Sequence, residues 1–411
     1  MDGPTENDSL SVDAERLRRA REVRHLSRPQ LAALLGVSAD WVKKAETGDR
    51  VVDRLPMLYR LCRILGLSDV SELTGGQMPM PVATGGRLTH PGVNSLRAAV
   101  HAPLFADAGE PEDVGVLVER VRQTWAIWHG VREQRTAVAT DLPDLIRTGH
   151  ATMRAAQGPE KRRAAVVLSE VYALAQQYAA HIVDPPLYWT LVDRSRMAAE
   201  QADDVLALAG AAWVTGNGLR AAGDTESARR VAADAAETLE SSLEGGSDRL
   251  RGLYGSLCLH VALSAAQERR EGDAWHWWDK ADLAAAHLGP RYMHPWTAFG
   301  QGNVRVHGVS IAGDLGTHGA ALQRMSEVDP ETIPSVERRS RLYLDAARGE
   351  RARRQVAAAL TYLRLAVTTS PEAVRYTPVG RALAEDLSRT APPALRRTAH
   401  EVAVLVGVPL A

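Results

Sequence analysis

The run LSRPQLAALLGVSADWVKKAETG, residues 26–48, contains the signals for two short helices joined by a tight turn. Ser27 is a suitable N-cap, and Pro29 falls in the first helical turn, where its missing N–H costs little. Gly36 suits the left-handed position that ends a helix, and Ser38 can cap the next one. The run therefore predicts a helix that stops at Gly36 and a second helix from Ala39 to Glu46.

Helices are also predicted on both sides of this run. From Asp13 to Arg24 the inward positions recur at helical spacing, at Ala14, Leu17, Ala20 or Arg21, and Val23 or Arg24, while arginines 16, 18, 19 and 21 fill much of the remaining circumference. A further helix has Pro56 near its start and an apolar face of Leu58, Leu61, Leu65 and Leu67. The helix before Gly36 is expected to bury Leu31, Ala32, Leu34 and Leu35. Together these segments predict a small helical domain over residues 13–74.

This arrangement closely resembles the lambda-repressor-like (Cro/C1, or XRE) helix-turn-helix family. The matching features are Ala32, the turn Gly36-Val37-Ser38, Val42 and the ending Glu46-x-Gly48. The resemblance implies that the helix over 39–46 lies in the major groove of DNA, with its N-terminal residues nearest the base edges.

The resemblance also implies which side chains read the bases. Lys44 could donate to guanine O6 and N7, and Asp40 could accept from cytosine N4. Ala39 could touch a thymine methyl group, whereas Lys43 is expected to contact phosphate. The alternative is that these residues form only a solvated helix face.

Further phosphate contacts are expected from Arg28, Arg50 and Arg54. Arg28 stands where the family usually has a phosphate-contacting glutamine, so a donor is kept and a charge is added. Trp41 occupies a position that is usually small and polar. It either packs beside the sugar–phosphate chain or, as we expect, packs against the helix that follows.

The rest of the chain is predicted to have three further parts. Residues 1–12 carry three acidic side chains and no basic one, and are expected to form a disordered acidic tail. The stretch GGQMPMPVATGG, residues 75–86, is rich in glycine and proline and begins a flexible linker over 75–112. An apolar patch from Leu96 to Phe105 within it could strap across the body or reach a partner subunit. Residues 113–411 form the third part.

Every segment of this third part is predicted to be helical. The stretch AAWVTGNGLRAAGDTESARRVAADAAETL, residues 211–239, resembles a tetratricopeptide repeat, with Gly216 at a close helix approach and Gly223-Asp224 at the turn. Similar turn signals occur at Gly272-Asp273, Gly313-Asp314, Val183-Asp184 and Arg348-Gly349-Glu350. We therefore expect an all-α chain in which an adaptor, residues 113–157, precedes about five degenerate helical hairpins stacked as a right-handed α-solenoid.

The repeat pattern places a set of polar and aromatic side chains on the concave face of such a solenoid. Asparagine can pair with a peptide group, arginine can hold a carboxylate, and aromatic rings can bury apolar parts of a ligand. The alternative is that these residues only stabilise helix contacts, and Trp275, Trp277 and Trp278 are expected to be core. The candidate ligand-binding residues are Trp213, Asn217, Arg220, Trp296, Phe299, Asn303 and His307.

Composition limits the possible functions. Residues 13–75 hold 12 basic and 9 acidic side chains, which is compatible with nucleic-acid binding, although the whole chain has a net charge of −1. Cys62 and Cys258 are too few for a disulfide framework or a cysteine-based zinc site. No secretory signal, membrane helix, nucleotide-binding loop, metalloprotease or hydrolase motif is present. We expect a cytoplasmic protein that is not an enzyme and has no metal or cofactor.

The combined architecture resembles the signal-responsive regulators of Gram-positive bacteria, which bind small peptides in a solenoid groove. This resemblance implies a homodimer on a pseudo-palindromic DNA operator, in which a peptide or small-molecule signal, as in quorum sensing, changes DNA affinity. Two alternatives remain: a tetratricopeptide scaffold that acts through protein–protein contacts, and a body that hides an enzymatic pocket. Burial of Trp213, Asn217 and Arg220 by neighbouring helices would favour the scaffold, and a central cluster of titratable groups would favour the pocket.

Overall fold

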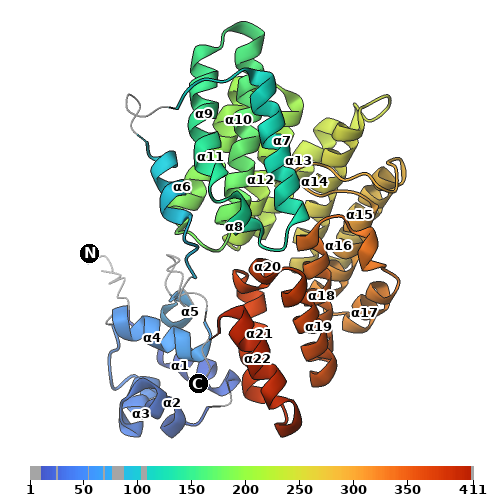
Figure 1. Cartoon of the computed structure of the whole chain (residues 1–411). Helices are drawn as coiled ribbons and strands as arrows, with labels where there is room; N and C mark the ends of the chain where they lie inside the picture. The colour runs from blue at the N-terminus through green and yellow to red at the C-terminus, as the bar shows by residue number, and fades with distance from the viewer. Residues whose placement is uncertain are drawn as a thin grey trace, which may run out of the picture. The chain divides into compact units, whose positions relative to one another are not determined.

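The computed structural model describes residues 11–24, 26–53, 55–67, 70–75, 88–102 and 109–408. Within these ranges the chain forms helices and no strand, so the expected all-α class is confirmed (Figure 1). The chain divides into two compact units, with the boundary between Leu88 and Thr89. Each unit is described separately below.

The first unit contains five helices in its described residues: α1 (Ala14–Val23), α2 (Arg28–Leu35), α3 (Ala39–Thr47), α4 (Leu55–Leu65) and α5 (Ser71–Thr74). The Ser27 hydroxyl accepts from the backbone N–H of Gln30, and the Gln30 side chain accepts from the backbone N–H of Ser27 at 2.8 Å. Gly36 ends α2 with φ of +66°, and Ser38 caps α3. The capping residues predicted from the sequence therefore fix the end of α2 and the start of α3, on either side of the turn.

The core of the first unit is aliphatic and includes Leu17, Leu31, Val42, Leu58 and Leu61. One expectation about it is wrong. Leu34 is 53% exposed, because Leu31, Ala32 and Leu35 fill the inward face of α2 and Leu34 lies to one side of it. Of the two residues predicted as alternatives for the next inward position of α1, Arg21 is buried and Ala20 is partly buried.

The second unit begins inside the segment that was expected to be a linker. Residues 93–100 form α6 (Val93–Val100), which contacts α9 (Asp141–Ala155) and buries Val93 and Leu96. Residues 88–102 are thus structured, because this apolar patch has a helical face to pack on. Residues 76–87 and 103–108 of the expected linker lie outside the described residues, as do residues 1–10 of the expected acidic tail.

Helices α7 (Val114–Gly130), α8 (Gln134–Val138) and α9 occupy the place of the expected adaptor, and five hairpins follow. The hairpins are consistent with a solenoid, and the first helices of the last four contact one another in succession. The chain then ends with α20 (Pro371–Arg375), α21 (Pro378–Thr390) and α22 (Arg396–Val406). The hairpins are α10 (Gly158–Ala179) with α11 (Pro185–Ala202), α12 (Val205–Ala221) with α13 (Thr225–Glu240), α14 (Asp248–Gln267) with α15 (Glu271–Ala286), α16 (Gln301–Asp314) with α17 (His318–Ser326), and α18 (Val336–Ala352) with α19 (Val356–Thr369).

Only some of the expected turn signals lie in turns. Gly223 has φ of +87°, and Asp224 and Asp184 cap α13 and α11. Gly272-Asp273 instead lies in the first turn of α15, Gly313-Asp314 ends α16, and Arg348-Gly349-Glu350 lies within α18. In these hairpins the left-handed turn residue is Arg269, Gly316 or Arg354, which is why a Gly-Asp pair misplaces the turn by a few residues.

The two ends of the second unit are joined by a seam between α8 and α20 (Figure 1). The Glu372 carboxylate accepts from the backbone N–H of Arg135 at 2.6 Å and from the Thr136 hydroxyl at 2.6 Å. The buried Arg135 guanidinium donates to the carbonyl oxygens of Tyr178 and Ala180. The Ser370 hydroxyl donates to the Arg132 carbonyl oxygen at 2.9 Å. Residues more than 230 positions apart in sequence are therefore fixed to each other.

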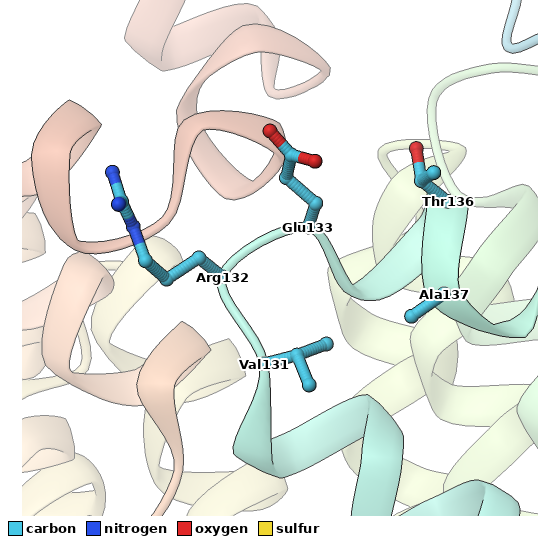
Figure 2. Close-up of a pocket in the computed structure, with 5 residues that line it drawn as sticks. All are labelled: Val131, Arg132, Glu133, Thr136 and Ala137. Atoms are coloured by element: carbon cyan, nitrogen blue, oxygen red, sulfur yellow. The ribbon is translucent and has the colours of Figure 1, made fainter.

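An open pocket lies beside this seam, at the turn between α7 and α8 (Figure 2). It is lined by Val131, Arg132, Glu133, Thr136 and Ala137. The Thr136 hydroxyl and the Arg132 carbonyl oxygen are already bound to the C-terminal residues of the seam. The other polar groups that line the pocket are the exposed side chains of Arg132 and Glu133.

Candidate DNA-binding surface and ligand site

Helix α3 turns one polar face to solvent and one apolar face to the domain core. Ala39, Asp40, Lys43 and Lys44 are exposed, whereas Val42 is buried. The Ser38 hydroxyl accepts from the Trp41 backbone N–H at 3.1 Å and so fixes the start of the helix. The side chains predicted to face DNA therefore share one exposed, rigidly mounted surface.

Two of these side chains are bound to each other. Lys44 Nζ lies 2.8 Å from a carboxylate oxygen of Asp40, one helical turn away. This hydrogen bond and the lysine charge lower the pKa of Asp40. The pair is exposed, so solvent weakens it and each partner is free to exchange the other for a base edge.

Trp41 and Arg50 extend this surface beyond α3. The Trp41 ring is partly buried against the domain core, and the Arg50 guanidinium lies 5.5 Å from the ring centroid. A cation over an aromatic face is held in place with little loss of exposure, so Arg50 stays available to a phosphate. Arg54 lies outside the described residues.

A buried carboxylate ties the three helices of the motif together. Glu46 of α3 accepts from Arg21 Nε of α1 at 2.5 Å and from Arg28 Nε of α2 at 2.8 Å. Its side chain is 0% exposed and that of Arg21 is 9% exposed. Burial acts to raise the pKa of Glu46, but the hydrogen bonds from the two arginines outweigh burial and lower it.

This pairing changes how Arg28 is interpreted. Its Nε is committed to Glu46, and its side chain remains 38% exposed. Arg28 therefore helps to orient α3, and only its terminal nitrogens remain for the predicted phosphate contact. The sequence identified Glu46 only as part of the helix-turn-helix motif. The one sequence signal of its partner was that Arg21 could occupy an inward position of the helix over 14–23.

The comparisons with known proteins bear on this unit. Residues 14–73 match the family model described as "Helix-turn-helix domain". These residues form a helix-turn-helix domain. The match ends before the second unit, and no curated protein matches the chain significantly. The helix-turn-helix domain implies DNA binding.

In the second unit, four of the seven predicted ligand-binding residues are packed inside the protein. Trp213, Trp296, Phe299 and Asn303 are each no more than 4% exposed. Trp296 and Phe299 lie in the connection between α15 and α16, where their rings fill the space beside Gly210 of α12 and Gly255 of α14. Their placement on a ligand-binding surface is therefore wrong for this structure, because the pattern treated a buried connection as part of a helix.

The other three predicted residues remain half-buried. The Arg220 guanidinium donates to Asn217 Oδ1 at 3.1 Å and lies against the ring of His260, with Nη1 3.3 Å from Nδ1. His307 Nδ1 lies 2.9 Å from the carbonyl oxygen of Asn303. Arg220 and His307 come from different hairpins, and the positive charge of Arg220 lowers the pKa of His307, after the larger effects of burial and Arg338. These residues form the core of a second candidate site.

The three expected core tryptophans do pack against the core. Trp275, Trp277 and Trp278 all contact the apolar cluster between α14 and α16, and Trp278 Nε1 donates to the Val304 carbonyl oxygen at 2.9 Å. Among the described residues no His, Cys, Asp and Glu side chains are grouped as a metal site requires. No helix in the described part of the chain has the length and apolar character needed to cross a membrane.

Proposed function

We propose that this protein is a sequence-specific transcriptional regulator whose helix-turn-helix domain reads operator DNA through α3. The observation that carries the proposal is the exposed face of Ala39, Asp40, Lys43 and Lys44, fixed by caps at both ends of the preceding turn. The Arg21–Glu46–Arg28 bridge holds that face at a set angle to α1 and α2. A recognition helix needs this rigidity, because base contacts depend on donors and acceptors being held in register with the groove.

We further propose that the regulator acts as a homodimer on a pseudo-palindromic operator. A single small helix-turn-helix domain contacts about 600–1,000 Å² of DNA and seldom reaches operator-level affinity, whereas two domains on paired half-sites do. The second unit would then bind a peptide or small-molecule signal. A signal changes DNA affinity only if it binds one arrangement of the dimer better than another.

Selection of bound DNA from a random pool by the full-length protein tests this proposal. The expected product is a two-fold symmetric motif with half-sites about one helical turn, 10–10.5 base pairs, apart. Lys44→Ala should lower affinity and relax base preference at one position in each half-site. Lys161→Ala, which removes an exposed lysine of α10, is the matched control and should change neither.

Two outcomes count against parts of the proposal. Equal weakening of all sequences by Lys44→Ala would make Lys44 a phosphate contact. Failure to enrich any motif at physiological salt would remove the claim of sequence-specific binding.

The structure agrees with the two alternative functions, scaffold and enzyme, to different extents. Trp213 is buried, as the scaffold alternative requires, but Asn217 and Arg220 are only half-buried, which favours a ligand contact. Titratable groups do meet in the second unit, as the enzyme alternative requires. The basic groups around Arg220 are arginines and histidines, and burial and neighbouring charges lower the pKa of the histidines, which keeps them neutral. Histidines that stay neutral at neutral pH suit a binding site better than a site of proton transfer.

A further inference from the structure

Five basic side chains come together from the first helices of four consecutive hairpins. They are Arg220 of α12, His260 of α14, His307 of α16, and Arg338 and Arg341 of α18. We name this group the arginine–histidine cluster. Arg220 touches the His260 ring, and burial together with the charges of Arg341 and Arg338 lowers the pKa of Arg220 to about 10.

Most charges around the cluster are paired. Arg341 Nε donates to Asp345 at 3.0 Å, and Arg338 Nε lies 3.3 Å from a carboxylate oxygen of Glu337. Arg348 bridges Asp345 and Asp314, at 3.0 Å from each. Four guanidinium groups thus face three carboxylates, which leaves one positive charge in excess.

The excess charge lies at Arg220. Among the described residues no carboxylate lies within ion-pair distance of it, and its polar contacts are the Asn217 oxygen and the His260 ring. A neutral imidazole has one acceptor nitrogen, so His260 accepts one hydrogen bond and supplies no charge. Burial and the neighbouring arginines lower the pKa of His260, so it remains neutral beside Arg220.

A second group beside Arg220 also lacks a partner. The side-chain nitrogen of Asn217, Nδ2, is buried and donates no hydrogen bond, although the oxygen of the same amide accepts from Arg220. A buried donor without an acceptor and a half-buried cation without a counter-ion are both unfavourable. An anion against the exposed part of Arg220 would supply the missing counter-charge.

We propose that the arginine–histidine cluster binds the anionic group of a ligand, a carboxylate or a phosphate, with the half-buried Arg220 guanidinium as its direct donor. Arg338 and Arg341 add positive potential, and neutral His260 and His307 line the site without competing for the anion. A guanidinium can donate two parallel hydrogen bonds to either group, so geometry alone accepts both chemistries. The inference rests on the proposed role of the second unit as a signal receptor, and it adds the chemical class of the signal.

Thermal unfolding of the full-length protein tests this proposal, with citrate as the carboxylate probe and pyrophosphate as the phosphate probe. Ionic strength is held constant with sodium chloride. At least one probe should raise the unfolding temperature by several degrees at about 10 mM, because a ligand that binds only the folded state stabilises it by RT ln(1 + L/Kd), which grows with the ratio of the ligand concentration L to Kd. The probe that acts at the lower concentration identifies the source of the anion.

Arg220→Gln should remove this rise, and Arg230→Gln, an exposed arginine of α13, should leave it intact. An equal rise in all three proteins would be a general salt effect and would overturn the proposal, as would the absence of any rise. Without a probe, Arg220→Gln should unfold within about 2 °C of the parent or above it, because it removes an uncompensated charge. A large fall would make Arg220 a structural residue and would also overturn the proposal.

These measurements use no DNA, so they separate the two proposals. Operator selection without anion binding would reject the ligand class and leave the regulator in place. Anion binding without operator selection would do the reverse.

Discussion

Replacing Glu46 by glutamine should destabilise the helix-turn-helix domain far more than the loss of an ordinary surface charge. The side chains of Glu46 and Arg21 are 0% and 9% exposed, so water can solvate neither charge once the pair is broken. Removing one partner of a buried ion pair costs about 3–5 kcal/mol, and we expect the lower figure, about 3 kcal/mol, because the amide oxygen still accepts one hydrogen bond. A domain of this size has roughly 3–9 kcal/mol of stability at about 0.05–0.15 kcal/mol per residue.

Hydrogen exchange read by mass spectrometry isolates the effect in the full-length protein. Peptides from α1 to α3 should exchange roughly 100-fold faster in Glu46→Gln, whereas peptides from α14 serve as the internal reference. Arg18→Gln is the matched control, because it breaks an exposed ion pair of α1, Arg18–Glu22 at 3.0 Å, and leaves the carboxylates that contact Arg21 in place. It should change the free energy of unfolding by less than about 0.5 kcal/mol.

The same bridge predicts a dependence on pH. Because the pKa of Glu46 is lowered in the folded domain, its contribution is complete above the ordinary glutamate pKa and is lost as the pH falls through the lowered one. The parent domain should therefore lose protection in acid more steeply than Glu46→Gln. Exchange in Glu46→Gln within threefold of the parent at neutral pH would refute the reasoning, since it would mean that water reaches the two charges.

Three further substitutions test the second unit by thermal unfolding. Gly255→Ala should lower the unfolding temperature by several degrees, because a Cβ there would lie 2.0 Å from the Phe299 ring and overpacking costs about 1–3 kcal/mol. Gly313→Ala meets no atom within 4 Å in α16 and should be neutral or stabilising by up to about 1 kcal/mol; equal effects of the two alanines would contradict the packing argument. Glu372→Gln should cost about 1–3 kcal/mol, because it replaces one of the buried carboxylate oxygens that accept from the Arg135 and Thr136 N–H groups and from the Thr136 hydroxyl, and an unchanged transition would show that the seam is not needed for stability.

Local signals predicted the helix-turn-helix domain well. Ser27, Gly36 and Ser38 act on backbone groups within a few residues of themselves, so their effect can be read from the sequence alone. The Arg21–Glu46 bridge could not be read in this way. Its two residues are 25 positions apart, and only the packing of α1 on α3 brings them together.

In the second unit, too, local features were predictable from the sequence and long-range contacts were not. The recurring turn signals predicted about five hairpins, and the repeat pattern placed Asn217 and Arg220 beside each other one turn apart. The pattern failed for Trp296 and Phe299, because an aromatic side chain in a connection can fold back into a space left by a glycine on another hairpin. His260, Arg338 and Arg341 were missed because no single repeat contains the cluster.

The seam between α8 and α20 also changes how this unit must fold. An open array of repeats can gain or lose its terminal hairpins one at a time, because each touches only its neighbours. Here α8 and α20 hold each other across a separation of 237 residues, so the hairpins between them cannot open from either side without breaking Glu372 away from Arg135. During synthesis the backbone N–H groups of Arg135 and Thr136 cannot form their hydrogen bonds to Glu372 until Glu372 has left the ribosome. The emerging unit therefore passes through a long stage in which its first helices are made but cannot yet be closed.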